Sequence, residues 1–207
     1  MVCYCPERKI IYIHNPKTGG LTIEEILVKY YNFKHFSFNN GRYEFLRNDF
    51  GKIGIYRYIL ENSYESKIYD LKSFFKFTFV RNPVDRGLSA LRYLKERYLY
   101  FFPKTFEKFL LECETDPYLY IHFVNSQSDH LKDEEGLINF DFIGRFENFN
   151  SDLKKVLFEV CKLPEVNFDE IHINSSKLSN EMFSYEEVSN YIREKHREDF
   201  LNFNFKN

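Results

Sequence analysis

The sequence predicts an α/β fold with three layers, in which a central and mainly parallel sheet is flanked by helices. Two apolar runs, residues 10–13 and 74–80, have the length and composition of buried strands. Each is followed by a turn and then by apolar residues at helical spacing, and a third strand-to-helix junction is expected over residues 140–161. Alternation of strands and helices is typical of parallel sheets.

Length and composition indicate one domain that spans residues 1–207. A chain of 207 residues can bury a substantial core without metals or disulfides. The formal net charge of −2 gives no reason to expect binding to nucleic acid, so any anion site must be local. Four cysteines are too few for a disulfide framework, and the pair Cys3 and Cys5 alone is a poor zinc signature. No leader and no apolar run of about 20 residues is present, so we expect a cytoplasmic chain without a membrane span.

The first candidate site lies in the turn after the first strand, which reads Pro16, Lys17, Thr18, Gly19 and Gly20. Glycines let the backbone approach an anion, and the first helical N–H groups point at it. The nucleotide triphosphatase P-loop places its lysine after the second glycine, whereas here the lysine comes first. An ordinary turn with an exposed lysine is the alternative.

The second candidate site follows the strand at residues 74–80. Arg81 stands at the carboxyl end of this strand, Pro83 suits a first helical turn, and Ser89 lies on the helix that follows. Ligands of open α/β sheets bind outside the carboxyl ends of the strands, so both sites should share one edge. The alternatives are a salt bridge between Arg81 and Asp85 and a small residue at position 89.

Both sites resemble motifs of sulfotransferases that use 3′-phosphoadenosine 5′-phosphosulfate (PAPS). PKTGG after a strand is similar to their 5′-phosphosulfate loop, and FVRNPVDRGLSALRYL is similar to their 3′-phosphate motif. GRFENF, the following Asp152 and Leu153, and the closing REDFLNFNF extend the resemblance from about residue 9 to residue 205. The chain resembles a small soluble member of the carbohydrate branch, sulfotransferase family 2, which includes the heparan, chondroitin and dermatan 2-O type.

The resemblance implies a P-loop-like fold, PAPS as cofactor, adenosine 3′,5′-bisphosphate as product, and no metal. A loop near residue 174 is expected to close over the nucleotide. One departure is Leu21, where the family usually has a hydroxyl residue, so the anion contacts should depend on Thr18, Thr22 and the backbone. The candidate cofactor-binding residues are Pro16, Lys17, Thr18, Gly19, Gly20, Leu21, Thr22, Arg81, Ser89, Asn174, Ser175 and Lys177.

Two residues are candidates for catalysis. Lys17 can neutralise charge on the leaving group, and His35 is the first choice of general base because imidazole titrates near neutral pH. Glu24, Glu44 and His122 are alternative bases, whereas His14 and His172 are expected to orient the backbone.

Gln127 and Ser128 are candidates for substrate binding, because they stand in a polar loop after an aromatic run and resemble a Gln-Ser pair of the family. A surface loop without a function is the alternative for residues 118–131. Arg145 and Glu147 are expected to pair near the sheet edge.

Further helices are predicted over residues 42–49, 53–61, 103–113, 150–161 and 185–200, the last opened by a capping box of Ser184 and Glu187.

Taken together, the sequence predicts a PAPS-dependent sulfotransferase that acts on a hydroxyl compound, most simply a sugar. A P-loop-like nucleotide kinase, a noncatalytic module that binds adenosine bisphosphate, and a structural protein are the alternatives. The sequence does not identify the acceptor.

Overall fold

The computed structural model describes residues 2–38, 54–98, 102–168, 171 and 183–206. Its centre is a mixed sheet with the strand order β3-β1-β2-β4-β5. The strands are β1 (Val2–Cys5), β2 (Ile10–Ile13), β3 (Lys34–His35), β4 (Phe75–Val80) and β5 (Phe142–Arg145). β2, β4 and β5 pair in parallel, so their carboxyl ends meet at one edge of the sheet. The predicted α/β class is confirmed.

β1 and β3 extend the sheet in a way that the sequence analysis missed. β1 pairs antiparallel with both β2 and β3. Cys3 is the partner of Tyr12 on one side and of His35 on the other. His35 therefore lies level with the carboxyl end of β2, two strands away from it.

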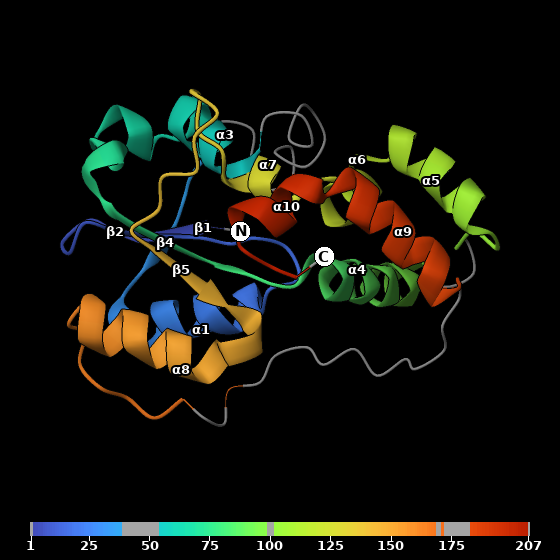
Figure 1. Cartoon of the computed structure of the whole chain (residues 1–207). Coiled ribbons are helices and arrows are strands. Elements are labelled where there is room, and N and C mark those ends of the chain that lie inside the picture. Colours follow the sequence, from blue (N-terminus) through green and yellow to red (C-terminus); the bar gives the residue numbers. More distant parts are fainter. Residues whose placement is uncertain (1, 39–53, 99–101, 169–170, 172–182, 207) are drawn as a thin grey trace.

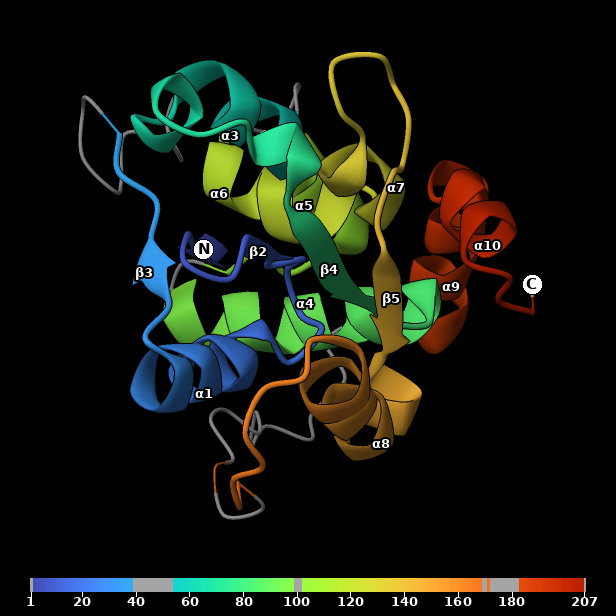
Figure 2. The same ribbon diagram turned by 90° about the vertical axis from the view of Figure 1, so that its left-hand side faces the viewer.

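Helices cover both faces of the sheet, as Figures 1 and 2 show. α1 (Gly20–Tyr31) and α8 (Phe149–Lys154) lie on one face, and α3 (Ile55–Asn62) and α7 (Gln127–Leu131) lie on the other. Strand residues alternate between two cores because successive side chains point to opposite faces. Tyr12 and Phe77 pack in the core of α1 and α8, whereas Ile11 and Ile13 pack in the core of α3 and α7.

A third core lies beside the sheet, under the helices at the right of Figure 1. Its helices are α4 (Pro83–Tyr98), α5 (Phe106–Thr115), α6 (Pro117–Leu119), α9 (Tyr185–Lys195) and α10 (Arg197–Asn202). Phe106, Phe109 and Phe123 form its aromatic centre, with edge-to-face contacts of Phe123 on the other two rings. This core places α4 and α10 near the carboxyl edge of the sheet.

Most predicted helices are confirmed with small shifts of their ends. The capping box is present, since Ser184 Oγ accepts from the Glu187 N–H and the Glu187 side chain accepts from the Ser184 N–H. The last predicted helix breaks at His196 into α9 and α10. The helix predicted over residues 42–49 lies outside the described residues.

Two local predictions were wrong. Residues 118–131 do not form a loop, because α6, a π-helical turn (Tyr120–Val124) and α7 occupy this segment. Arg145 and Glu147 do not pair with each other, because each side chain bonds a backbone group distant in the sequence. Arg145 donates to the Phe203 carbonyl, and Glu147 accepts from the Asn82 N–H at 2.6 Å.

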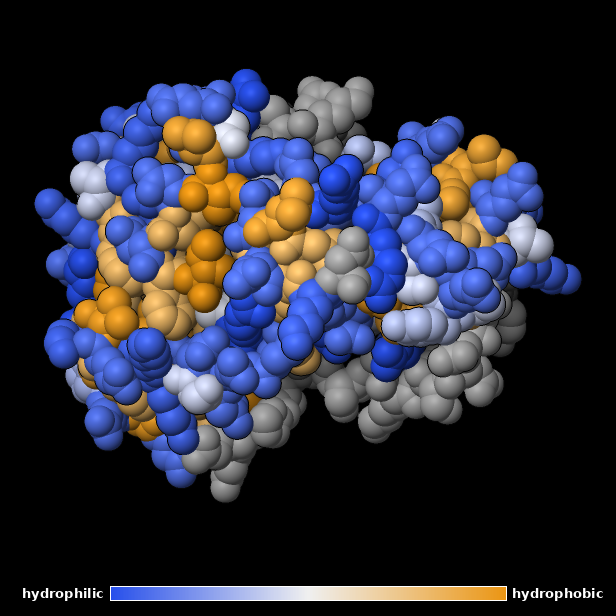
Figure 3. Space-filling view, viewed as in Figure 1, coloured by the Kyte–Doolittle hydropathy of each residue, from blue (hydrophilic) through white to orange (hydrophobic). Residues whose placement is uncertain are grey.

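The face of the molecule seen in Figure 1 carries hydrophobic residues on the half that holds β5, as Figure 3 shows. β5 is an edge strand of the sheet, and its Ile143 is 37% exposed. None of the described helices is both long and apolar enough to cross a membrane.

Candidate anion-binding and catalytic site

The first loop has the backbone shape of an anion site. Lys17 and Gly19 both adopt positive φ angles, 68° and 81°, and α1 begins at Gly20. The Gly19 carbonyl accepts the N–H groups of Thr22 and Ile23 at 3.1 and 3.3 Å. The N–H groups at the two preceding helical positions have no acceptor in an earlier turn of the helix, so they point beyond the carboxyl end of β2.

Both glycines of the loop are required by their surroundings. A Cβ atom on Gly20 would lie 2.2 Å from Cδ2 of His14, and one on Gly19 would lie 2.6 Å from a ring carbon of Phe149. The positive φ of Gly19 disfavours any other residue independently of this contact. The loop backbone therefore packs closely against His14 and Phe149 on one side, and its N–H groups lie on the other side.

The Thr18 hydroxyl closes the loop from within. Thr18 is buried, and its Oγ1 donates to the Asn15 carbonyl at 2.8 Å. The single hydroxyl hydrogen is thus used inside the protein, and the anion contact expected of Thr18 stays a prediction. Thr18 can contribute its backbone N–H, and Thr22 is buried in the first turn of α1.

The two predicted cations lie side by side. Nη1 of Arg81 is 3.5 Å from the carbonyl oxygen of Lys17, and the Arg81 guanidinium stacks 4.2 Å from the centre of the Phe146 ring. Burial, with the positive charge of Arg81 as a smaller cause, lowers the pKa of Lys17 to about 8. Burial likewise lowers the pKa of Arg81. Two positive charges that lie close together repel each other, so binding of an anion between them is favoured.

Tyr93 supplies the surface on which Lys17 lies, a contact that the sequence analysis missed. Nζ of Lys17 is 4.0 Å from the centre of the Tyr93 ring. Tyr93 lies on α4, four residues after Ser89, so both belong to the same face of the helix. Ser89 is therefore directed to the side of α4 that meets the first loop.

A cluster of His14, Glu24 and His35 lies next to the loop. Nδ1 of His14 is 2.7 Å from Oε1 of Glu24. Burial raises the pKa of the Glu24 carboxyl, but the hydrogen bond from His14 and nearby positive groups, His35 among them, outweigh burial and lower this pKa to about 2. Glu24 is thus ionised at neutral pH, and it favours the protonated form of a neighbouring imidazole.

The alternative bases are less suited to proton abstraction. Burial lowers the pKa of His122 to about 3, and its Nδ1 lies 2.8 Å from the Tyr118 carbonyl. Glu24 is engaged with His14. Among the described candidates, His35 is the one that is half-buried in a strand, β3, level with the carboxyl end of β2. Glu44, His172, Asn174, Ser175 and Lys177 lie outside the described residues.

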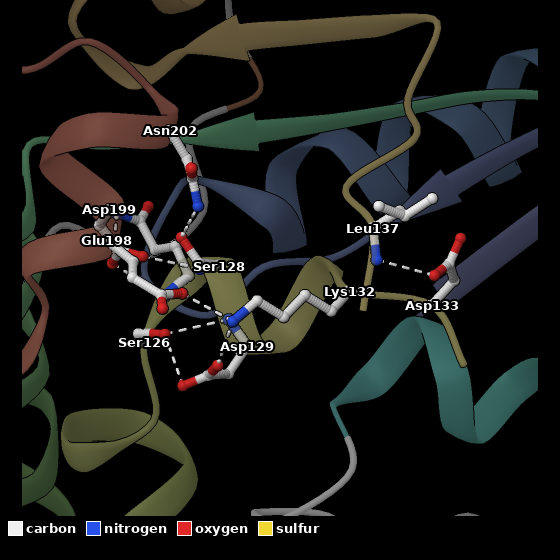
Figure 4. Close-up of polar contacts among 10 residues, drawn as sticks. Ser126, Ser128, Asp129, Lys132, Asp133, Leu137, Glu198, Asp199 and Asn202 are labelled. Carbon is white, nitrogen blue, oxygen red and sulfur yellow. Dashed lines mark hydrogen bonds and ion pairs between the residues drawn. The ribbon is translucent and has the colours of Figure 1, made fainter. Parts of the chain in front are cut away.

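Gln127 and Ser128 do not line an open acceptor loop, which corrects the expectation for these residues. Both are fully buried in α7. Ser128 Oγ accepts from Asn202 at 3.1 Å, and Figure 4 shows Asp199 and Asn202 of α10 reaching toward it. Gln127 hydrogen-bonds the backbone of Arg81 instead. An uncharged polar pair followed by apolar Leu131 is compatible with a buried helix as well as with a loop, so the pattern alone did not distinguish them.

These features define an α/β protein of the P-loop-like type, with the cationic side chains of Lys17 and Arg81 at the carboxyl edge of its sheet. A family model described as "Sulfotransferase family" matches residues 1–206 of the chain. The chain therefore belongs to the sulfotransferase family, and the resemblance seen in the sequence is confirmed. Searches of curated proteins and of solved structures found no match.

Proposed function

We propose that the protein transfers the sulfuryl group of PAPS to a hydroxyl group of a carbohydrate. Membership of the sulfotransferase family supports sulfuryl transfer in general. The observation that carries the proposal is that Lys17 and Arg81 come from two different strand ends and lie together, with Nη1 of Arg81 3.5 Å from the Lys17 carbonyl oxygen. A donor whose ribose carries two anionic groups, the 5′-phosphosulfate and the 3′-phosphate, matches two loops that each present a cation.

The residues of both loops fit this donor. The first loop, Pro16 to Thr22 including Leu21, offers backbone N–H groups and Lys17 to the 5′-phosphosulfate. Its glycines form a cradle in which no Cβ fits. Arg81 and Ser89 are assigned to the 3′-phosphate, and Asn174, Ser175 and Lys177 to further nucleotide contacts. The lowered pKa of Lys17 is consistent with a site that is built to receive negative charge.

When bound, PAPS supplies an activated sulfuryl group. With a pKa of about 8, the Lys17 ammonium is mostly protonated at neutral pH and can neutralise charge that develops on a leaving oxygen. His35 accepts the proton of the acceptor hydroxyl. The ionised Glu24 close to His35 stabilises the imidazolium that results. Positioning and charge stabilisation then carry the reaction, and no metal ligand set is required of the protein.

Calorimetric titration with adenosine 3′,5′-bisphosphate, without magnesium and alongside ATP, tests the proposal. We expect selective binding of the bisphosphate, weakened in Lys17→Ala and in Arg81→Ala by roughly tenfold to hundredfold, because each charged hydrogen bond contributes about 1.5–3 kcal/mol. Lys29→Ala is the matched control, since Lys29 is exposed in the last turn of α1.

The other outcomes separate the alternatives. Tighter binding of ATP with magnesium would indicate a nucleotide kinase. Selective bisphosphate binding without sulfuryl transfer from PAPS to any of a panel of saccharides would indicate a noncatalytic module. No nucleotide binding by the folded protein would overturn the proposal.

A further inference from the structure

The buried side chain of Gln127 connects the two candidate anion-binding loops from the interior of the protein. Its Oε1 accepts from the Arg81 N–H at 2.8 Å and from Nδ2 of Asn15 at 3.4 Å. Its Nε2 donates to the Arg81 carbonyl at 2.8 Å and to Oδ2 of Asp199 at 3.3 Å. All four hydrogen-bonding positions of the amide are therefore used. Asn15 directly precedes the first loop and accepts from its Thr18, and Arg81 begins the second, so a single side chain contacts residues at both loops.

Asp199 in turn holds Gln127 in place. Its two carboxylate oxygens accept the N–H groups of Gln127 and Ser128 at 2.9 and 2.7 Å, which are the first two N–H groups of α7. A carboxylate at a helix start satisfies N–H groups that lack acceptors in the helix. Asp199 is fully buried, and the buried Arg86 beside it supplies opposite charge. The C-terminal helix α10 is thus tied through α7 to the residue that we assign to the 3′-phosphate.

A second set of contacts joins the same two helices without reaching the loops. Asn202 of α10 donates to Oγ of Ser128, as Figure 4 shows. Nζ of Lys132, the residue directly after α7, lies 2.6 Å from Oε2 of Glu198 of α10. These residues attach α10 to α7 as Gln127 and Asp199 do, but they do not contact Arg81 or Asn15. They serve as internal controls for any role of Gln127 beyond packing.

We propose that Gln127, oriented by Asp199, is a positioning residue that sets the spacing of the two anion-binding loops and directs the Arg81 side chain to the 3′-phosphate of the nucleotide. The inference deepens the proposed function and rests on it for the identity of the ligand. Gln127 does not touch the ligand. It acts by holding both backbone polar groups of Arg81, so its loss changes recognition of the group that Arg81 binds and leaves the rest of the nucleotide site in place.

The test compares two ligands in the full chain, adenosine 3′,5′-bisphosphate and adenosine 5′-monophosphate, which lacks the 3′-phosphate. Gln127→Met keeps the size of the side chain and removes its hydrogen bonds. We expect it to weaken bisphosphate binding roughly tenfold to hundredfold, as small displacements of a binding group do, and to leave monophosphate binding within about twofold. Ser128→Ala, equally buried in α7, should leave both affinities within about twofold.

A double-mutant cycle shows whether Gln127 acts through Arg81. In an Arg81→Ala background, Gln127→Met should cause little further loss of bisphosphate affinity. Equal weakening of both ligands, additive effects in the cycle, or unchanged bisphosphate affinity in a folded Gln127→Met protein would each overturn the inference. If Gln127→Met does not fold, Asp199→Asn is measured in the same way, with the same preference for loss of bisphosphate binding.

Hydrogen exchange at the Arg81 amide tests the role of Gln127 without a ligand, and so independently of the proposed function. The Arg81 N–H should exchange slowly in the wild type and in Ser128→Ala, and fast in Gln127→Met. If the wild type fails to bind the bisphosphate, the proposed function fails, and the exchange rates alone decide the inference. Equal protection of Arg81 in both variants would then overturn it.

Discussion

The ammonium nitrogen of Lys17 lies 4.0 Å from the centre of the Tyr93 ring. The cation of the first loop is therefore held by α4, the helix that follows the second loop. The hydroxyl groups of Tyr93 and Tyr118 are hydrogen-bonded to each other, which keeps the Tyr93 ring in this orientation. The contact is a cation–π interaction in a half-buried site, where such pairs are worth about 0.5–2 kcal/mol. Lys17 thus depends on α4 for the placement of its ammonium group.

Bisphosphate binding should depend on pH through Lys17. The pKa of Lys17 is about 8 in the protein without ligand, and a bound anion raises it. Binding is therefore tightest below pH 8 and weakens above it, by up to about tenfold per pH unit until the pKa of the complex is reached. Titrations between pH 7 and pH 10 measure this slope.

Lys17→Arg is the control for the pH dependence, because a guanidinium stays charged over this range. The variant should lose the slope above pH 8. A slope that persists unchanged in Lys17→Arg would show that another group controls the pH dependence.

Gly20→Ala should destabilise the protein by about 1–3 kcal/mol, as overpacked sites do, because the new methyl group collides with the His14 ring. His14→Ala removes the obstacle, so the double variant should recover part of the stability lost in Gly20→Ala. Urea unfolding of the three variants measures this.

Gly136→Ala is a contrasting case, in which backbone strain acts without a collision, whereas Gly20 has no positive φ. Gly136 has a φ of 77° and no atom within 4 Å of its Cβ position, so its substitution introduces strain alone. If His14→Ala does not relieve the loss of stability in Gly20→Ala, contact with the His14 ring is not the cause of that loss.

His35→Gln should lower the rate of sulfuryl transfer by about 10²–10⁴, the usual contribution of a general base, while the affinity for the bisphosphate stays nearly constant. Rates are measured with PAPS and the best saccharide of the panel. Lys34→Ala is the matched control, because Lys34 is the neighbouring residue of β3 and is exposed. Loss of bisphosphate binding in His35→Gln would assign His35 to the nucleotide site instead.

Ser184→Ala should lower the free energy of unfolding by about 1 kcal/mol, since it removes the side-chain cap of α9. Ser184→Thr retains the hydroxyl and should restore most of this stability. Thermal unfolding gives the comparison, and bisphosphate affinity should be the same in both variants. A large loss of affinity in Ser184→Ala would mean that α9 influences the site directly.

The sequence by itself determined the local units of this protein. The strand, the glycine turn and α1 follow one another within residues 10–31, and so do β4, Arg81 and α4 within residues 75–98. Such units depend on apolar periodicity, on glycines and on caps, all of which act between residues close in the chain. The placement of both loops at one sheet edge followed from the parallel pairing of β2 and β4.

Only the tertiary structure decided how those units are held together. Gln127 looked like part of a polar loop, yet it bonds Arg81 and Asp199, which are 46 and 72 residues away. The partner of Arg145 is the Phe203 carbonyl, 58 residues away, and not nearby Glu147. A buried polar group must find its hydrogen-bond partners wherever the fold places them. Those partners are not encoded by spacing along the chain, because they are set by the packing of α7 and α10 against the sheet.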